Sequence, residues 1–303
     1  MKKTEEIKIG KHVVAQTNRQ KIYWPEEGYT KGDMLDYYDR VSDFILPFLK
    51  GRPLSLKRNP NGITDAGFYH KDAGENTPSY VDVFKVKSGS KDKIIDYIVC
   101  NNKATLLYVA NLGCIEMNPW NSTTKKPGNP TWMVIDIDPS AKNTFQDVVD
   151  VAQVTKDVLA GAGVKSYCKT SGSSGLHVYV PLKNRYEYET VKNFAHVVAS
   201  LVQEQLPDTT SLVRSLSKRG SNIYIDYLQN RTGQTLASVY SLRPVPGAQV
   251  STPLEWKEVT HKLHPSQFTI KNIFKRLEKK GDLFAPVIKE GESLSKALKN
   301  LGG

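Results

Sequence analysis

The chain has 303 residues, of which 39% are hydrophobic and 24% charged, a composition typical of a globular protein with a sizeable core and unlike that of a disordered or fibrous chain. Its 42 Lys and Arg residues outnumber 31 Asp and Glu residues, which gives a net charge of +11. This excess favours a polyanionic partner, most simply nucleic acid, and a basic enzyme with a diffuse charge is the alternative.

Three features of the sequence bear on where the protein works. The N-terminal sequence MKKTEEIKIGKH contains lysines but lacks the apolar segment of a signal peptide. No run approaches the roughly 18 apolar residues of a membrane-spanning helix. The cysteines, Cys100, Cys114 and Cys168, are far apart and lack metal-binding spacing, so we expect reduced core thiols. We therefore expect a cytoplasmic protein that does not contact a membrane.

The first strong helix signal follows a polar, turn-rich segment at residues 17–32. Thr30 and Asp33 have the spacing of a capping box, with Asp in place of the usual Glu or Gln. Apolar residues then recur at close to helical spacing as far as Leu49. Pro47 is expected to end or bend this helix.

Between residues 50 and 130 the sequence predicts mainly short strands. Asn102 is expected to cap one short helix that ends near Ala110. The segment SGSKDK should form a hairpin turn between two of the strands. The predicted strands cover residues 53–58, 68–71, 79–87, 93–99 and 114–120.

The second half of the chain alternates helices with strands. Thr144 is expected to cap a helix that reaches about Leu159, and another helix ends before Pro207. This second helix covers residues 187–206, and a helical turn at 253–259 and a basic helix at 269–280 follow it. The predicted strands are 132–138, 165–170, 176–182, 221–230 and 238–244. Because hairpins interrupt the alternation, we expect an α/β fold with a mixed sheet.

The stretch WMVIDIDPS, residues 132–140, contains two acidic residues at strand spacing. Side chains two apart on a strand point to the same face, so Asp136 and Asp138 should lie side by side while Ile135 and Ile137 face the core. Neighbouring carboxylates repel each other, so one should hold a proton or both should hold a cation such as Mg or Mn. The alternative is a solvated strand edge without a function.

Asp226, in the segment IYIDYLQN, is a third carboxylate in a strand pattern. Three aspartates are enough to hold two divalent ions roughly 4 Å apart. That arrangement serves nucleotidyl transfer and also phosphodiester hydrolysis. The acids alone do not decide between these reactions.

The segment TSGSSGLHVYVPL, residues 170–182, favours a nucleotide substrate. Its small residues, from Ser171 to Gly175, allow backbone N–H groups to approach a phosphate. His177 lies in the strand that follows, where it can donate to a phosphate oxygen, although most single histidines are structural. Lys57 and Arg243 are further candidates for a phosphate contact, and an ordinary surface cation is the alternative for each.

Two adjacent aromatic residues suggest a place where nucleic-acid bases stack. Phe68 and Tyr69 are followed by Lys71, which would add a phosphate contact. Two aromatic side chains buried at a strand end are the alternative, and the sequence does not choose between them.

Three motifs carry a resemblance to a known family. IDID at 135–138, SGSSGLH at 171–177 and IDYLQN at 225–230 resemble the motifs of the archaeo-eukaryotic primase superfamily. Over about residues 15–290 the chain is similar to the polymerase domain of bacterial DNA ligase D, an end-joining enzyme. Longer strings share in the similarity: KIYWPEEGYTKGDMLDYY, LKGRPLSLKRNPNGI, ANLGCIEMNPW and YSLRPVPGAQVSTPLEW.

The resemblance implies a primase-like mixed-sheet fold with flanking helices, in a single polymerase domain over residues 1–303. The part at about 15–110 would bind DNA ends, about 111–250 would form the catalytic core, and about 251–295 a helical tail. The implied activity is template-dependent polymerisation that fills gaps and extends ends at double-strand breaks, with a preference for ribonucleotides. The implied cofactors are two Mn or Mg ions, and the implied partners are Ku and a DNA ligase.

The resemblance also implies roles for individual residues. Asp136, Asp138 and Asp226 would be the metal ligands and the catalytic residues. The incoming NTP or dNTP would bind Ser171, His177, Lys57, Arg243, Asn118 and Gln229. Gapped DNA would bind through its 5′-phosphate at Lys21 and Lys31, and through its template strand at Phe68 and Tyr69, beside Lys71.

The sequence departs from the family pattern at two positions. Relatives often carry Lys where this chain has Ser174, and His where it has Asn118. Both changes remove a phosphate donor, so triphosphate affinity should be weaker or supplied elsewhere. No ligase motif of the Lys-x-Asp-Gly type occurs in this sequence.

Two other functions compete with the polymerase. A non-catalytic module that bridges DNA ends and recruits a ligase would use the same basic charge and aromatic pair. A two-metal nuclease would use the same acids, but it leaves the Ser/Gly loop and His177 without a role.

Overall fold

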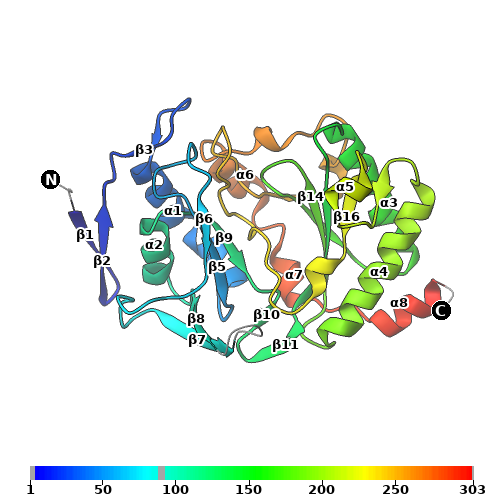
Figure 1. The fold of residues 1–303 in the computed structure, drawn as a ribbon, viewed down its shortest axis with the longest axis horizontal. Helices are drawn as coiled ribbons and strands as arrows, with labels where there is room; N and C mark the ends of the chain where they lie inside the picture. Colours follow the sequence, from blue (N-terminus) through cyan, green and yellow to red (C-terminus); the bar gives the residue numbers. More distant parts are fainter. Residues whose placement is uncertain (1–3, 88–92, 302–303) are drawn as a thin grey trace.

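A six-stranded sheet forms the centre of the computed structural model, which describes residues 4–87 and 93–301 (Figure 1). The strand order is β15 (Thr210–Ser211), β16 (Ile223–Asp226), β12 (Trp132–Asp138), β14 (Leu176–Pro181), β13 (Tyr167–Thr170) and β17 (Pro253–Leu254). β15 runs parallel to β16, and all other neighbours are antiparallel. The predicted mixed-sheet α/β fold is therefore confirmed.

Two long helices lie side by side against one face of this sheet (Figure 1). They are α3 (Phe145–Gly161) and α4 (Tyr188–Gln205). The side chain of Thr144 accepts from the backbone N–H of Asp147, which confirms the predicted cap of α3. α4 ends two residues before Pro207, as the sequence predicts.

Strand β12 separates two hydrophobic cores. Met133, Ile135 and Ile137 pack with α3 and α4 in one core, whereas Trp132 and Val134 belong to the other. The period-two pattern of the sequence is thus confirmed, because alternate side chains of β12 point to opposite faces. The two aspartates of β12 occupy the face of Val134, where the apolar residues of the second core stop.

A smaller sheet lies beside the first one and belongs to the N-terminal half of the chain (Figure 1). Its antiparallel strands are β6 (Phe68–His70), β5 (Leu54–Arg58) and β9 (Cys114–Pro119). Helices α1 (Lys31–Leu49) and α2 (Lys103–Asn111) contact each other and β9. Thr30 and Asp33 form the predicted capping box of α1, and Asn102 caps α2.

The remaining elements are short. Two-stranded sheets pair β1 (Thr4–Ile9) with β2 (His12–Thr17), β3 (Ile22–Trp24) with β4 (Tyr29–Thr30), β7 (Asp82–Lys87) with β8 (Ile94–Val99), and β10 (Ser122–Thr123) with β11 (Lys126–Pro130). The short helices are α5 (Leu216–Arg219), α6 (Ile273–Lys280), α7 (Ala285–Lys289) and α8 (Leu294–Asn300), with 3-10 turns η1 (Leu228–Asn230), η2 (Trp256–Glu258) and η3 (Pro265–Gln267).

Several sequence expectations need comment at their boundaries. Pro47 does not end α1, which continues to Leu49. Proline has no N–H to bond the carbonyl four residues earlier, and the residue there, Asp43, is exposed. The basic helix begins at Ile273 rather than at residue 269. The predicted turn SGSKDK lies largely outside the described residues.

The predicted strand at 238–244 is wrong. Tyr240 has a φ of 63°, a left-handed conformation that interrupts a strand. The segment instead folds back on residues 249–251, with backbone bonds from Tyr240 N to Ser251 O (2.7 Å) and from Arg243 N to Gln249 O (3.0 Å). The helical turn expected at 253–259 is β17 followed by η2.

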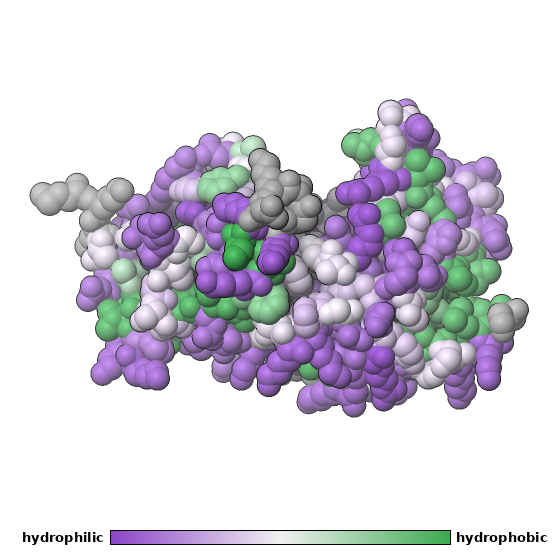
Figure 2. Space-filling model, turned by 60° about the horizontal axis from the view of Figure 1, so that its bottom comes forward, coloured by the Kyte–Doolittle hydropathy of each residue, from purple (hydrophilic) through white to green (hydrophobic). Residues whose placement is uncertain are grey.

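The surface, the helices and the cysteines bear on further expectations from the sequence. On the face shown in Figure 2, hydrophobic residues lie in separate groups among hydrophilic ones. Within residues 4–87 and 93–301, no helix is long and apolar enough to cross a membrane. The three cysteines are buried and free, as predicted.

Asn230 takes the place of a neighbouring strand along part of β12. Its amide accepts from Val134 N (2.8 Å) and donates to Val134 O (2.7 Å), and the side chain is fully buried. We predict that Asn230→Ala lowers the free energy of unfolding by about 2–4 kcal/mol, because both backbone groups lose their partner inside the protein. Urea denaturation measures this. Asn222→Ala, which removes one part-buried bond to Thr210 O, should cost less than about 1 kcal/mol.

Candidate active site

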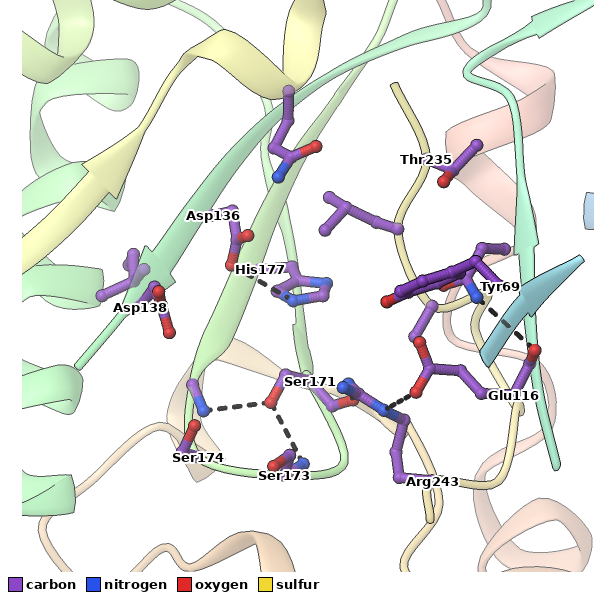
Figure 3. A pocket seen from close by; sticks show the side chains of 16 residues that line it. Tyr69, Glu116, Asp136, Asp138, Ser171, Ser173, Ser174, His177, Thr235 and Arg243 are labelled. Carbon is purple, nitrogen blue, oxygen red and sulfur yellow. Dashed lines mark hydrogen bonds and ion pairs between the residues drawn. The ribbon is translucent and has the colours of Figure 1, made fainter. Parts of the chain in front are cut away.

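A pocket of about 230 Å³ opens where the end of β12 meets the loop between β13 and β14 (Figure 3). The two aspartates of β12 and the loop form one side of it, and Tyr69 and Glu116 form the other. Among the predicted site residues, those that line it are Asp136, Asp138, Ser171, His177, Asn118, Gln229, Tyr69 and Arg243. Residues far apart in the sequence therefore meet at one place.

The register of the central sheet puts four polar residues in one row. Asp136 pairs with Asp226 on one side and with His177 on the other, and His177 pairs with Lys169. Directly opposed side chains of neighbouring strands share a face, so these four groups lie on the pocket side of the sheet. The row brings two predicted metal ligands and the predicted phosphate-binding histidine together.

Asp136 is the most perturbed carboxyl group of the pocket. Burial, and then the carboxylates of Asp226 and Asp138, raise its pKa to about 8. The sequence predicts that one of two neighbouring acids should hold a proton unless a cation is bound, and the raised pKa agrees with this. The Nε2 atom of His177 lies 3.3 Å from Asp136 Oδ1, and burial keeps the pKa of that histidine well below its usual value.

The other two aspartates have partners within the chain. Asp138 lies 3.6 Å from the guanidinium of Arg219, at the end of α5. Asp226 accepts from the backbone N–H of Leu228 (2.8 Å), from Tyr224 Oη (3.1 Å) and from Gln229 Nε2 (3.0 Å). Burial raises the pKa of both carboxyl groups.

Three carboxylates suit a hard divalent cation, which would offset the burial and the mutual repulsion that raise the pKa of Asp136. The donor set therefore fits Mg or Mn in chemistry and number. Within the described ranges, however, no three His, Cys, Asp or Glu side chains already surround one point as metal ligands do. Binding an ion would thus require the acids to turn away from partners such as Arg219.

The loop between β13 and β14 is braced by its first residue. Ser171 Oγ accepts from the backbone N–H of Ser173 (3.1 Å) and of Gly175 (3.0 Å), as Figure 3 shows. These two amides, which the sequence assigned to a phosphate, are therefore already bonded inside the loop. A Cβ at Gly175 would lie 2.3 Å from Ile137 O, so only glycine allows the loop this close to β12.

One ring nitrogen of His177 has no hydrogen-bond partner in the described part of the chain. Its Nε2 faces Asp136, while its Nδ1 is buried and has no hydrogen-bond partner within the described chain. A buried ring nitrogen without a partner is costly, so a ligand group is expected to satisfy it. The same holds for Gln229, whose amide nitrogen donates to Asp226 and whose Oε1 is buried without a partner in that part of the chain.

Three charged residues near the pocket were missed by the sequence reasoning. Glu116 bonds to Arg243 with a distance of 2.7 Å, and Arg219 is the partner of Asp138. Lys169 is fully buried, and burial together with the charge of Arg243 lowers its pKa to about 7. Its Nζ donates to Ser251 Oγ (2.6 Å) and Ala237 O (3.1 Å), below the pocket wall. The segment KSYCKT at residues 165–170 gives no signal that Lys169 is buried.

Lys57 does not line the pocket. Its Nζ donates to Ala66 O (2.8 Å) and lies 5.0 Å from the centre of the Tyr69 ring. Asn118 does line the pocket and is buried, and its amide nitrogen lies 3.4 Å from Glu116 O. Ser174 is exposed at the tip of the loop.

The aromatic pair is exposed, so the alternative of a buried pair is wrong. Phe68 is 48% exposed and Tyr69 61%. As neighbours on β6 they point to opposite faces, and only Tyr69 lines the pocket. The guanidinium of Arg58 lies 5.3 Å from the centre of the Phe68 ring, and Lys71 is exposed.

Lys21 and Lys31 lie side by side at one end of the small β3–β4 ladder, next to the Ile22–Thr30 pair, and the backbone N–H of Lys31 donates to Lys21 O (2.8 Å). Lys31 is only 4% exposed, and its Nζ lies 3.2 Å from Thr17 Oγ1. Burial, and then the charges of Lys21 and Arg58, lower its pKa to about 8. Lys21 bonds to the side chain of Asn61. No carboxylate of the described chain forms an ion pair with either lysine.

Comparison with known proteins identifies the family. Residues 30–284 match the family described as LigD, primase-polymerase domain. The chain belongs to the LigD primase-polymerase family. The resemblance read from its three motifs is thereby confirmed.

Individual relatives in this LigD family agree. The chain is 33% identical over 267 residues to the bifunctional non-homologous end joining protein LigD of Bacillus subtilis, covering 88% of this chain and 42% of that protein. It is 29% identical over 279 residues to the multifunctional non-homologous end joining protein LigD of Mycolicibacterium smegmatis, and the match covers 90% of this chain and 36% of that protein. It thus spans about two fifths of the length of these relatives.

A solved structure of the family shares the fold. The polymerase domain of Mycobacterium tuberculosis ligase D in complex with DNA superposes with a TM-score of 0.84, at 26% identity, covering 92% of this chain and 99% of that one. The expected primase-like fold is confirmed by this match.

The raised pKa of Asp136 leads to a prediction about stability. A folded Asp136 keeps its proton up to about pH 8, whereas an unfolded aspartate loses it near pH 4, so the wild type loses stability as pH rises between these values. In metal-free buffer at pH 8, Asp136→Asn should raise the melting temperature by about 2–5 °C, and by less at pH 5. Calorimetry with a chelator measures both values. An equal effect at both pH values would contradict the burial of this charge.

Proposed function

We propose that this LigD domain is a template-dependent nucleotidyltransferase that fills gaps and extends ends at DNA double-strand breaks. The observation that carries the proposal is the pocket itself. Asp136 and Asp138 face the Ser171–Gly175 loop and Arg243 across a space that His177 also lines. Acids for a metal and donors for a phosphate thus converge, as transfer of a nucleotide requires.

Asp136, Asp138 and Asp226 would hold two Mn or Mg ions. When bound, these ions lower the pKa of an attacking hydroxyl group and neutralise charge on the leaving phosphate. The negative charge of the three aspartates would then be balanced, and Arg219 would no longer be needed by Asp138.

The other pocket residues bind and orient the triphosphate. Arg243 would donate to phosphate oxygens, and the braced loop would exclude water from that side. His177 lines the same pocket and is a further candidate for contact with the phosphates. Gln229 offers a buried acceptor to a hydroxyl group of the nucleotide. Tyr69, on the opposite wall, would supply an aromatic face for a base, and Phe68, exposed on the other face of β6, would contact the template strand separately.

Lys21 and Lys31 would bind the 5′-phosphate of the downstream strand at a gap. A buried lysine in the first turn of a helix is unfavourable on its own, because the helix dipole and the desolvation both oppose its charge. The nearby charges of Lys21 and Arg58 add to this cost. A bound dianion removes it, and this is the support for a phosphate site here.

The wider role of the protein can be inferred from its relatives. Their names place them in non-homologous end joining, so we infer the same pathway here, with Ku and a DNA ligase as partners and chromosomal breaks in the bacterial nucleoid as the place of work. The related structure in complex with DNA supports DNA binding. We expect ribonucleotides to be preferred, as the family resemblance implies.

The activity is tested by primer extension on a short gapped duplex with a 5′-phosphate, in Mn, with NTPs and with dNTPs. Templated extension is expected, faster with NTPs. Asp138→Ala should reduce it by at least about 1,000-fold, because a ligand of the ions is lost, while DNA binding stays within about threefold. Glu258→Gln, far from the pocket, is the matched control and should extend normally.

Retained extension in Asp138→Ala would overturn the metal assignment. Tight binding of the gap without extension, under any nucleotide or metal, would instead favour the non-catalytic bridging module. Degradation of the primer would favour a nuclease.

The phosphate site has its own pH signature. Because the pKa of Lys31 is lowered to about 8, its charge is present at pH 7 and lost above pH 9 in the free protein. Affinity for a 5′-phosphorylated gap should therefore fall about tenfold between pH 7 and pH 9.5, and Lys31→Arg should remove most of that fall because arginine stays charged. Fluorescence anisotropy measures this. If unphosphorylated gaps show the same fall, the assignment of Lys31 is wrong.

A further inference from the structure

Arg243 is held from three sides. Its Nε donates to Glu116 Oε2 (2.7 Å), and its Nη1 donates to Ser171 O (2.6 Å). A Cβ at Gly172 would lie 2.8 Å from Arg243 Cγ, so the loop also packs against the stem of the side chain. These contacts leave the outer N–H groups of the guanidinium to face the pocket that Arg243 lines (Figure 3).

Glu116 is an unexpected residue at this place. It lies on β9, in the smaller sheet, and its side chain is only 7% exposed. It is a third carboxylate in the lining of a pocket that already contains Asp136 and Asp138. Another negative charge beside a triphosphate opposes its binding, so the carboxylate must serve another purpose.

The ion pair is not needed to hold the backbone together. β9 is already fixed by antiparallel pairing with β5 from Leu54 to Arg58. The backbone of Arg243 is already bonded to Gln249 O (3.0 Å). The contact with Glu116 therefore acts on the guanidinium rather than on the strands.

We propose that Glu116 is a positioning residue, which fixes the plane of the Arg243 guanidinium so that its free N–H groups meet the phosphate at which transfer occurs. This inference rests on the proposed function of the same pocket. Since Glu116 balances the charge of Arg243, the arginine contributes mainly directed hydrogen bonds. Directed donors stabilise the transition state more than the bound substrate.

This role predicts opposite effects on binding and on rate. Removing the carboxylate eases the approach of an anion, so the affinity for nucleotide should not fall. Releasing the guanidinium misaligns its donors, so the rate of transfer should fall. A purely structural role does not predict that the rate falls while the affinity is kept.

The test compares Glu116→Gln, Glu116→Ala and Glu258→Gln in steady-state extension on the gapped duplex. For Glu116→Gln we expect kcat to fall about tenfold while KM for the NTP stays within about threefold or decreases. Glu116→Ala, which cannot accept from Arg243 at all, should lose kcat further. Glu258 forms a similar pair with Arg276 (2.6 Å) away from the pocket, so Glu258→Gln should leave kcat unchanged.

An unchanged kcat in Glu116→Gln and Glu116→Ala overturns the proposal. It is also overturned if KM rises and the melting temperature falls together at constant kcat, which is the pattern of a structural residue. If the wild type itself extends no primer, the proposed function fails and the positioning role, which rests on it, is overturned with it. Failure of the positioning role alone is distinguished from this, because the wild type then extends the primer and both Glu116 variants match its kcat.

Discussion

The register of β12 against its two neighbours is the constraint on which the pocket depends. It sets Asp136 between Asp226 and His177, and His177 next to Lys169. A slip of one residue would turn the acids of β12 into the apolar core and its isoleucines into the pocket. The hydrophobic packing of Ile135 and Ile137 against α3 and α4 therefore also fixes where the charged groups stand.

Much of this could be predicted because it is local. The alternation in β12, the caps of α1 and α3, and the small residues of the Ser171 loop each act within a few positions of the sequence. Glu116 and Arg219 could not be predicted, because their partners come from distant segments and a single charged residue carries no periodic signal. Lys57 was predicted to contact a phosphate from its charge and from the family resemblance, whereas in the structure its Nζ donates to Ala66 O. The left-handed backbone conformation of Tyr240 was not predicted, because the alternation of apolar residues carries no information about the φ angle of one residue.

The pocket is built at a cost to stability. Asp136 is buried among like charges, Lys169 is buried without an ion pair in the described chain, and His177 keeps an unsatisfied nitrogen. Each group would be better solvated in water. A ligand that satisfies several of these groups at once would recover part of this cost.

The position of β12 between two cores has a consequence for how the molecule comes apart. Trp132 and Val134 belong to the core that α1, α2, α6 and α7 enclose, and Met133, Ile135 and Ile137 to the core under α3 and α4. Neither core can lose this strand without exposing apolar side chains of the other. We therefore expect the two halves to unfold together, with β12 among the last segments to exchange its amide hydrogens.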